Sequence, residues 1–209
     1  SLFAEMGRDD VSLIFSGVRA LYHLHRDLLE SLAATGSLAA TFSEAFVVRL
    51  VHTYERYCKT FLVSQEALYQ CRKKSRAFAH LVQDVEARTG RGAGAGASQG
   101  AGQGVDDLFA APLRHVARYV ALFHDADQLH LSAADYEHCT RVGETLRDLD
   151  DEAQQALGMN TVRQVMRTVT GWPEGDNPLA PERRFVARFA ATSPAGQGEL
   201  LVFSDCALF

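Results

Sequence analysis

The stretch Pro112–Phe123, Pro-Leu-Arg-His-Val-Ala-Arg-Tyr-Val-Ala-Leu-Phe, decides how this chain is interpreted. At about 100° per residue, its pattern predicts a helix with one apolar side and one basic side. The apolar side is expected to carry Leu113, Val116, Val120 and Phe123. Arg114 and Arg118 fall together on the other side. Pro112 is predicted to lie in the first helical turn, where a missing N–H removes no hydrogen bond. Such a helix packs into a bundle and holds two guanidinium groups outward.

The composition is that of a globular protein. The chain has 209 residues, 47% hydrophobic and 22% charged, enough for one domain and part of another. A net charge of −5 argues against a broad nucleic-acid surface, so no nucleic-acid partner is expected. There is no membrane-length apolar run and no signal peptide. A start at Ser1 without methionine and an end at Phe209 predict an excised fragment.

The cysteines and histidines show no pattern of a metal or catalytic centre. The four cysteines lie far apart without a CxxC pair, which favours core positions and a reduced, cytoplasmic setting. His124 and His130 lie six residues apart and so face different sides of a helix, unlike helical zinc ligands. No serine or cysteine lies in a nucleophile elbow. We therefore expect no metal, no cofactor and no catalytic residue.

The first half of the chain predicts long amphipathic helices. A first helix is expected over 11–32, with Gly36 as its stop signal. A second begins after Thr41–Glu44, which has the spacing of a capping box, and continues past Phe61. Helical periodicity extends from there to residue 86, with a break expected near Ser64 or Lys73.

The second half contains an insertion, a long helix and strands. Residues 90–104 are a Gly/Ala-rich segment that cannot bury enough apolar area to order itself, so a disordered insertion is predicted. A cap at Ser132–Asp135 precedes a long helix. Gly158 is a candidate interruption of this helix, and the helical spacing resumes after it. The seam of that helix is predicted to consist of Cys139, Val142, Leu146, Leu149 and Ala153. After a linker at 178–181, alternating residues predict two or three short antiparallel strands.

Three stretches of the chain resemble one family. Pro112–Phe123 resembles the third signature block of Dbl-homology domains, the exchange domains of Rho-family guanine-nucleotide exchange factors. Phe15 with Leu24–Leu29 resembles the end of the first block, and Phe46 with Tyr54–Cys58 resembles the second. The third block is the most specific of the three.

The resemblance extends to the order of the domains. Tyr136 onward resembles the final long helix of the family, and 184–189 with 200–205 resemble the first strands of the pleckstrin-homology domain that usually follows. The expected fold is an all-α elongated bundle over 1–177. A short antiparallel β segment over 178–209 is expected from a truncated pleckstrin-homology-like domain.

The resemblance implies a function as well as a fold. It implies a guanine-nucleotide exchange factor that stabilises the nucleotide-free form of a Rho-family small GTPase, promotes GDP release and breaks no covalent bond. The implied partners are that GTPase and, through the truncated pleckstrin-homology part, a membrane phosphoinositide. The resemblance also implies a cytoplasmic location, with recruitment to membranes or to the cytoskeleton.

Three residues are candidates for contact with the GTPase. Arg118 matches the basic position of the third block that contacts the GTPase, and a guanidinium suits bidentate bonds to carboxylates or backbone carbonyls. Arg114 lies on the same stripe, and Gln154 lies on the final helix. The residues alone favour solvated side chains on exposed helix faces, and only the resemblance makes contact through Arg118 an equal alternative.

The chain also departs from the family pattern. The opening of the first block, with its switch-contacting Glu, is not found before Asp10. His115 stands where Arg is usual, and Gln154 replaces the expected Asn. These departures favour an alternative function, a degenerate Dbl-homology scaffold that binds a partner without nucleotide exchange.

Overall fold

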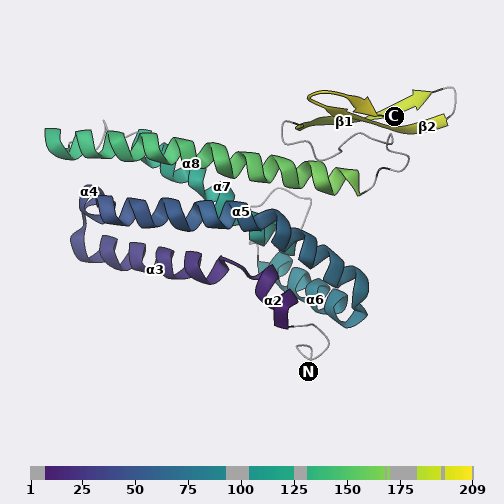
Figure 1. The fold of residues 1–209 in the computed structure, drawn as a ribbon, viewed down its shortest axis with the longest axis horizontal. Coiled ribbons are helices and arrows are strands. Elements are labelled where there is room, and N and C mark those ends of the chain that lie inside the picture. Colours follow the sequence, from purple (N-terminus) through teal and green to yellow (C-terminus); the bar gives the residue numbers. More distant parts are fainter. Residues whose placement is uncertain are drawn as a thin grey trace. The chain divides into compact units, whose positions relative to one another are not determined.

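The protein is mostly helical, with antiparallel strands near its C-terminus (Figure 1). The computed structural model describes residues 8–92, 104–124, 131–167, 169, 183–193 and 196–208. The chain forms two compact units, one ending at Gln154 and the other beginning at Gln155. The predicted fold class, a helical bundle followed by a short antiparallel β segment, is confirmed. No helix in the described ranges has the length and apolar character that a membrane crossing requires.

The helix predicted over 11–32 is in fact two helices, α2 (Arg8–Ile14) and α3 (Val18–Thr35). The break falls at Gly17, whose φ of 80° lies in the left-handed region. A Cβ atom at this position would lie 2.9 Å from Cδ2 of Tyr57. Both the backbone conformation and the close approach of a tyrosine ring therefore require glycine. The apolar spacing continues across the break and does not reveal it.

Substituting this glycine should cost more stability than substituting the glycine that ends α3, Gly36, whose stop role is confirmed. We expect Gly17→Ala to lower the free energy of unfolding by about 2–3 kcal/mol, because left-handed strain adds to the contact with Tyr57. Gly36→Ala is the matched control, since its φ is also positive, at 60°, but nothing lies within 4 Å of an added Cβ. It should cost about 1 kcal/mol. Urea unfolding measures both losses, and equal losses would show that the ring moves aside freely.

The predicted capping box at Thr41–Glu44 is wrong. Thr41 ends a short helix, α4 (Leu38–Thr41), and its hydroxyl donates to the carbonyl of Ser37 at 2.6 Å. The side chain of Ser37 caps α4. The next helix, α5 (Glu44–Lys74), follows Ser43 without a side-chain cap bond. The threonine is engaged in the preceding turn and is therefore not available to cap α5.

The break expected near Lys73 is confirmed, because α5 ends at Lys74 and α6 (Arg76–Gly92) follows. Ser64, the other position considered, lies inside α5, and its hydroxyl donates to the carbonyl of Leu13 at 2.8 Å. The helix α6 reaches into the first residues of the predicted insertion at 90–104. Residues 93–103 lie outside the described part, so the insertion stays a prediction.

The helix α7 (Val105–His124) contains the stretch that decided the interpretation, but it begins earlier than expected. Pro112 lies inside this helix, not in its first turn, and deprives the carbonyl four residues earlier of an intrahelical donor. The hydroxyl of Tyr57 donates to the neighbouring carbonyl of Phe109 at 2.7 Å. The buried side consists of Phe109, Ala110, Leu113, Val116, Tyr119 and Phe123. Val120, expected on that side, is only half-buried.

The helix α8 (Ala133–Met166) follows its predicted pattern closely. The hydroxyl oxygen of Ser132 accepts from the backbone N–H of Asp135 at 3.2 Å, which confirms the cap. Gly158 does not interrupt the helix. Every residue of the predicted seam is buried, namely Cys139, Val142, Leu146, Leu149 and Ala153. A Cβ atom at Gly143 would lie 3.2 Å from Cβ of Phe123, so α8 and α7 pack closely there.

The C-terminal unit has its own small core. Strands β1 (Phe185–Ser193), β2 (Gly196–Phe203) and β3 (Ala207–Leu208) form an antiparallel sheet in that order, which confirms the predicted strands. Its buried residues are Val162, Val165, Leu201 and Phe203. Arg183 donates both Nε and a terminal nitrogen to the Asp205 carboxylate at 2.9 and 2.7 Å. The predicted boundary at 177/178 lies outside the described residues and stays a prediction.

Candidate functional site

The exposed side of α7 carries the two arginines that the sequence singles out. Both Arg114 and Arg118 are exposed, as predicted. A terminal guanidinium nitrogen of Arg114 lies 2.6 Å from Oδ1 of Asp107, an acidic residue in the first turn of the same helix. Arg114 is therefore partly neutralised within its own helix.

Arg118 differs from its neighbour Arg114 in the part of the chain that the structure describes. Among the residues that the structure describes, no hydrogen bond or ion pair involves its guanidinium. Its five N–H donors are therefore available to an incoming carboxylate or carbonyl. The buried Val116 and Tyr119 on the same helix leave the backbone under this arginine well fixed.

Gln154 lies on α8 and is exposed. Its amide Nε2 donates to Oδ1 of Asp150, one turn earlier, at 3.2 Å. None of the interactions found within the described ranges joins Gln154 to Arg114 or Arg118. The structure therefore places the three candidates on exposed helix faces without bringing them into contact.

Close to Arg118 lies a partly buried polar cluster of His25, Tyr54, His115 and Tyr119, which the sequence analysis did not predict. Nε2 of His25 on α3 lies 2.9 Å from the Tyr54 hydroxyl on α5. Nδ1 of the same ring lies 3.0 Å from the Tyr119 hydroxyl on α7. The ring of His115 meets that of Tyr119 edge to face, with centroids 4.9 Å apart. The bundle partner that a buried tyrosine hydroxyl requires at Tyr119 is thus His25.

Burial and charge keep this cluster neutral near pH 7. The pKa of His25 lies below 6.5, first because the ring is desolvated and second because His115 is close. The pKa of His115 is also lowered, by burial and then by the positive charge of Arg118. Burial raises the pKa of Tyr119 to about 12. The exposed Arg118 therefore stands next to uncharged rings.

One feature of the sequence indicates that His25 belongs to a buried polar cluster. Its neighbours along the helix face, Leu21, Leu24 and Leu28, are buried, so the histidine lies on the apolar stripe of α3. A polar side chain on such a stripe needs a buried hydrogen-bond partner. The identity of that partner depends on how α3 meets α5 and α7, which the spacing of one helix does not contain.

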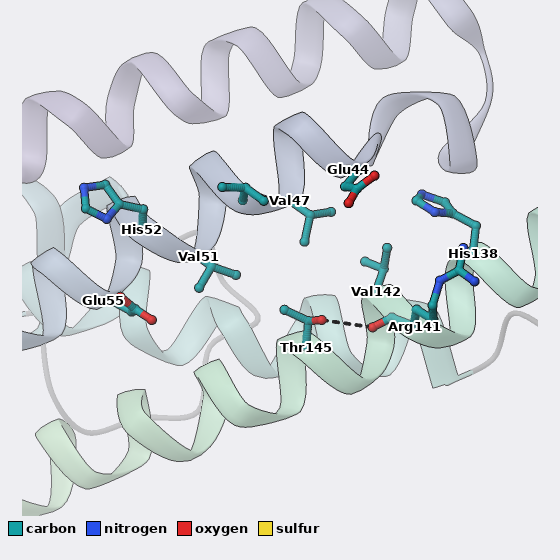
Figure 2. Close-up of a pocket in the computed structure, with 10 residues that line it drawn as sticks. Glu44, Val47, Val51, His52, Glu55, His138, Arg141, Val142 and Thr145 are labelled. Carbon is teal, nitrogen blue, oxygen red and sulfur yellow. Dashed lines mark hydrogen bonds between the residues drawn. The ribbon is translucent and has the colours of Figure 1, made fainter.

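Two cavities of the described part lie elsewhere. A groove of about 580 Å³ separates α5 from α8, and Figure 2 shows valines at its centre with Glu44, Glu55, His138 and Arg141 around them. A second cavity, of about 390 Å³, has an almost wholly apolar lining from α5, α6, α7 and the segment between α2 and α3. None of Arg114, Arg118 and Gln154 lines either cavity. The candidate site is therefore a helix surface and not a pocket.

The metal site that the sequence analysis considered and rejected, around His124 and His130, lies largely outside the described residues. Asp125, Asp127 and His130 all lie there, so the expectation that no metal binds near His124 stays a prediction. Within the described ranges, no group of three or more His, Cys, Asp or Glu side chains is placed to hold a metal ion.

Comparison with known protein families gives a match over most of the chain. The model of the RhoGEF domain matches residues 2–154, and it ends at the residue where the first compact unit ends. The chain therefore belongs to the RhoGEF, or Dbl-homology, domain family. This result confirms the resemblance carried by the third signature block. No curated protein sequence gives a significant match.

Solved structures show the same fold. The apo structure of an activated truncation of Vav1 is 16% identical, has a TM-score of 0.55 and aligns over 95% of this chain and 51% of that one. A structure of the DH/PH domains of p115-RhoGEF is 15% identical, with a TM-score of 0.57, over 96% of this chain and 65% of that one. The chain spans about half the length, 51%, of the Vav1 chain it matches. The short C-terminal sheet fits a partial pleckstrin-homology domain.

Proposed function

We propose that this chain is a guanine-nucleotide exchange factor for a Rho-family small GTPase. It binds the nucleotide-free GTPase more tightly than the GDP-loaded form and so promotes GDP release. A protein can shift such an equilibrium only by its difference in affinity for the two forms. No covalent bond in the nucleotide is broken by the exchange factor. The observation that carries the proposal is the RhoGEF family match over residues 2–154.

The surface of α7 supports this proposal. Arg118 has an exposed guanidinium that no described residue pairs with, and it is proposed as the main contact with the GTPase. Arg114 and Gln154 are proposed as further contacts, and each would exchange its present partner, Asp107 or Asp150, for the GTPase. In the mechanism that the family implies, the third-block helix and the final helix grip the two switch loops and disturb the Mg²⁺ and phosphate site of the GTPase.

Two departures from the family pattern favour a second candidate function. His115 replaces the usual Arg and lies half-buried against Tyr119 and His25, where it presents no charge to a partner near neutral pH. Gln154 replaces the expected Asn. A degenerate Dbl-homology scaffold that binds its partner without releasing nucleotide is the alternative.

A nucleotide-release assay separates the two functions. Rho-family GTPases loaded with fluorescent GDP are mixed with the chain and excess unlabelled GDP, and the fall in fluorescence is followed. Accelerated release from at least one GTPase supports exchange. Binding to a GTPase without any acceleration, by a chain whose circular dichroism shows it to be folded, supports the scaffold.

The C-terminal unit is assigned a separate proposed role. Its sheet fits only the start of a pleckstrin-homology domain, which we place after a boundary at 177/178. A membrane phosphoinositide is the proposed ligand of the complete domain, and recruitment to membranes from the cytoplasm would follow. Sedimentation with vesicles that contain or lack phosphoinositide tests this role.

A further inference from the structure

The imidazole of His25 connects three helices. His25 on α3 is bonded through Nε2 to the hydroxyl of Tyr54 on α5, and through Nδ1 to the hydroxyl of Tyr119 on α7. Tyr54 is fully buried, and Tyr119 is 6% exposed. Both ring nitrogens are therefore occupied by hydroxyls that reach the ring from different helices.

The direction of these two hydrogen bonds depends on the charge of the imidazole. A neutral ring has one N–H and one lone pair, so one hydroxyl donates to His25 and the other accepts from it. A protonated ring has two N–H groups and no lone pair. The hydroxyl that donated must then turn its hydrogen away and accept from the ring instead, and a positive charge enters a desolvated cluster beside His115 and Arg118, which weakens the packing of the three helices.

The groups that face His25 oppose its protonation. From α5 the ring meets Tyr54, and from α7 it meets Tyr119 and His115, the latter with ring centroids 5.9 Å apart. Arg118 adds a positive charge beside His115. The pKa of His25 is lowered by desolvation and by His115, so the ring is neutral at neutral pH and becomes charged only at more acidic pH.

We propose that His25 is a positioning residue for nucleotide exchange. Its neutral ring holds Tyr119 and thereby fixes the part of α7 that presents the adjacent Arg118 to the GTPase. Protonation of the ring places a positive charge beside His115 and Arg118 and so weakens that hold. The proposal rests on the proposed exchange function, which it deepens by naming what orients the contact residue and what pH range it requires.

The test measures fluorescent GDP release across pH, from about pH 8 to about pH 5.5, where histidine changes charge. Two variants remove the link: Tyr119→Phe deletes one hydroxyl, and His25→Gln keeps a donor and an acceptor but does not titrate. The matched controls are Tyr22→Phe and His23→Gln, on the same helix as His25 but outside the cluster. GDP release by the GTPase alone is subtracted at each pH.

We expect the acceleration by the wild-type chain to decline below the ordinary histidine pKa of about 6.5. At neutral pH, the GTPase should release GDP about fivefold more slowly with Tyr119→Phe than with the wild-type chain. This is the loss expected for one buried hydrogen bond. His25→Gln should show a flatter pH profile. Both controls should keep the wild-type rate and profile. A Tyr119→Phe variant with the wild-type rate and pH profile would overturn the proposal.

A second readout separates this proposal from the proposed function. If the wild-type chain accelerates GDP release from none of the GTPases tested, the proposed exchange function is wrong. The positioning role is then read from amide hydrogen exchange in peptides that cover 113–120 of the free chain. Faster exchange in Tyr119→Phe than in wild type and Tyr22→Phe supports the hold on α7. Unchanged protection contradicts it. This measurement needs no partner.

Discussion

Arg118→Glu is expected to reduce GDP release by at least about tenfold, because a charge-assisted hydrogen bond contributes about 1.5–3 kcal/mol and the new carboxylate repels acidic partner groups. The thermal midpoint should stay within a degree or two of wild type, since exposed substitutions away from caps and the core rarely change stability by more than about 0.5 kcal/mol. Fluorescent GDP release and thermal circular dichroism, measured on the same preparation, give the two quantities.

The matched control for this charge reversal is Arg56→Glu. Arg56 is exposed on α5, on another helix from the basic stripe, so its reversal changes the net charge of the chain equally. Equal loss of exchange in both variants would indicate general electrostatic attraction instead of a specific contact. Wild-type exchange by Arg118→Glu would remove this residue from the site.

Val116→Asp should leave the bundle unfolded. Val116 is 0% exposed, and an unpaired carboxylate at such a position costs several kcal/mol, a large part of the about 5–15 kcal/mol that stabilises a domain of ordinary size. Val120→Asp, only four residues along α7, should remain folded with a reduced stability, because Val120 is half-buried and its carboxylate can reach water. Far-ultraviolet circular dichroism and urea unfolding distinguish the two variants. Similar behaviour would contradict the orientation of α7 described here.

Val116 and Val120 differ in burial, which helical periodicity alone did not predict. Spacing placed both valines on the apolar side, but Tyr119 occupies the core in place of Val120. A tyrosine is buried when its hydroxyl finds a partner, and His25 supplies one from another helix. Propensity and spacing within α7 contain no information about that partner.

In the other helices, too, features set by residues within one helix were predicted, and features set by contacts between helices were not. The seam and cap of α8 were predicted correctly because both depend on residues within the helix itself. The break at Gly17 was missed because it is required by the ring of Tyr57, forty residues later. The start of α7 was misplaced because Pro112 was treated as a first-turn residue. The acidic Asp106 and Asp107 mark the true first turn.

The candidate site was predicted in part. Exposure of Arg114, Arg118 and Gln154 follows from helical periodicity and is confirmed. Their pairing was not predictable, because Asp107 reaches Arg114 across seven residues while no residue in the described ranges pairs with Arg118. Their contact with a GTPase remains a prediction, since it depends on a surface of another molecule.

The proline inside α7 has a mechanical consequence. Next to the carbonyl that loses its helical donor at Pro112, the Tyr57 hydroxyl of α5 donates to the carbonyl of Phe109 at 2.7 Å. This bond is directional and short-ranged, so α7 cannot slide along α5 by even part of a turn without losing it. Apolar side chains alone would tolerate such sliding. The tyrosine thus sets the axial register between two helices, and with it the height along the bundle at which Arg118 meets a partner.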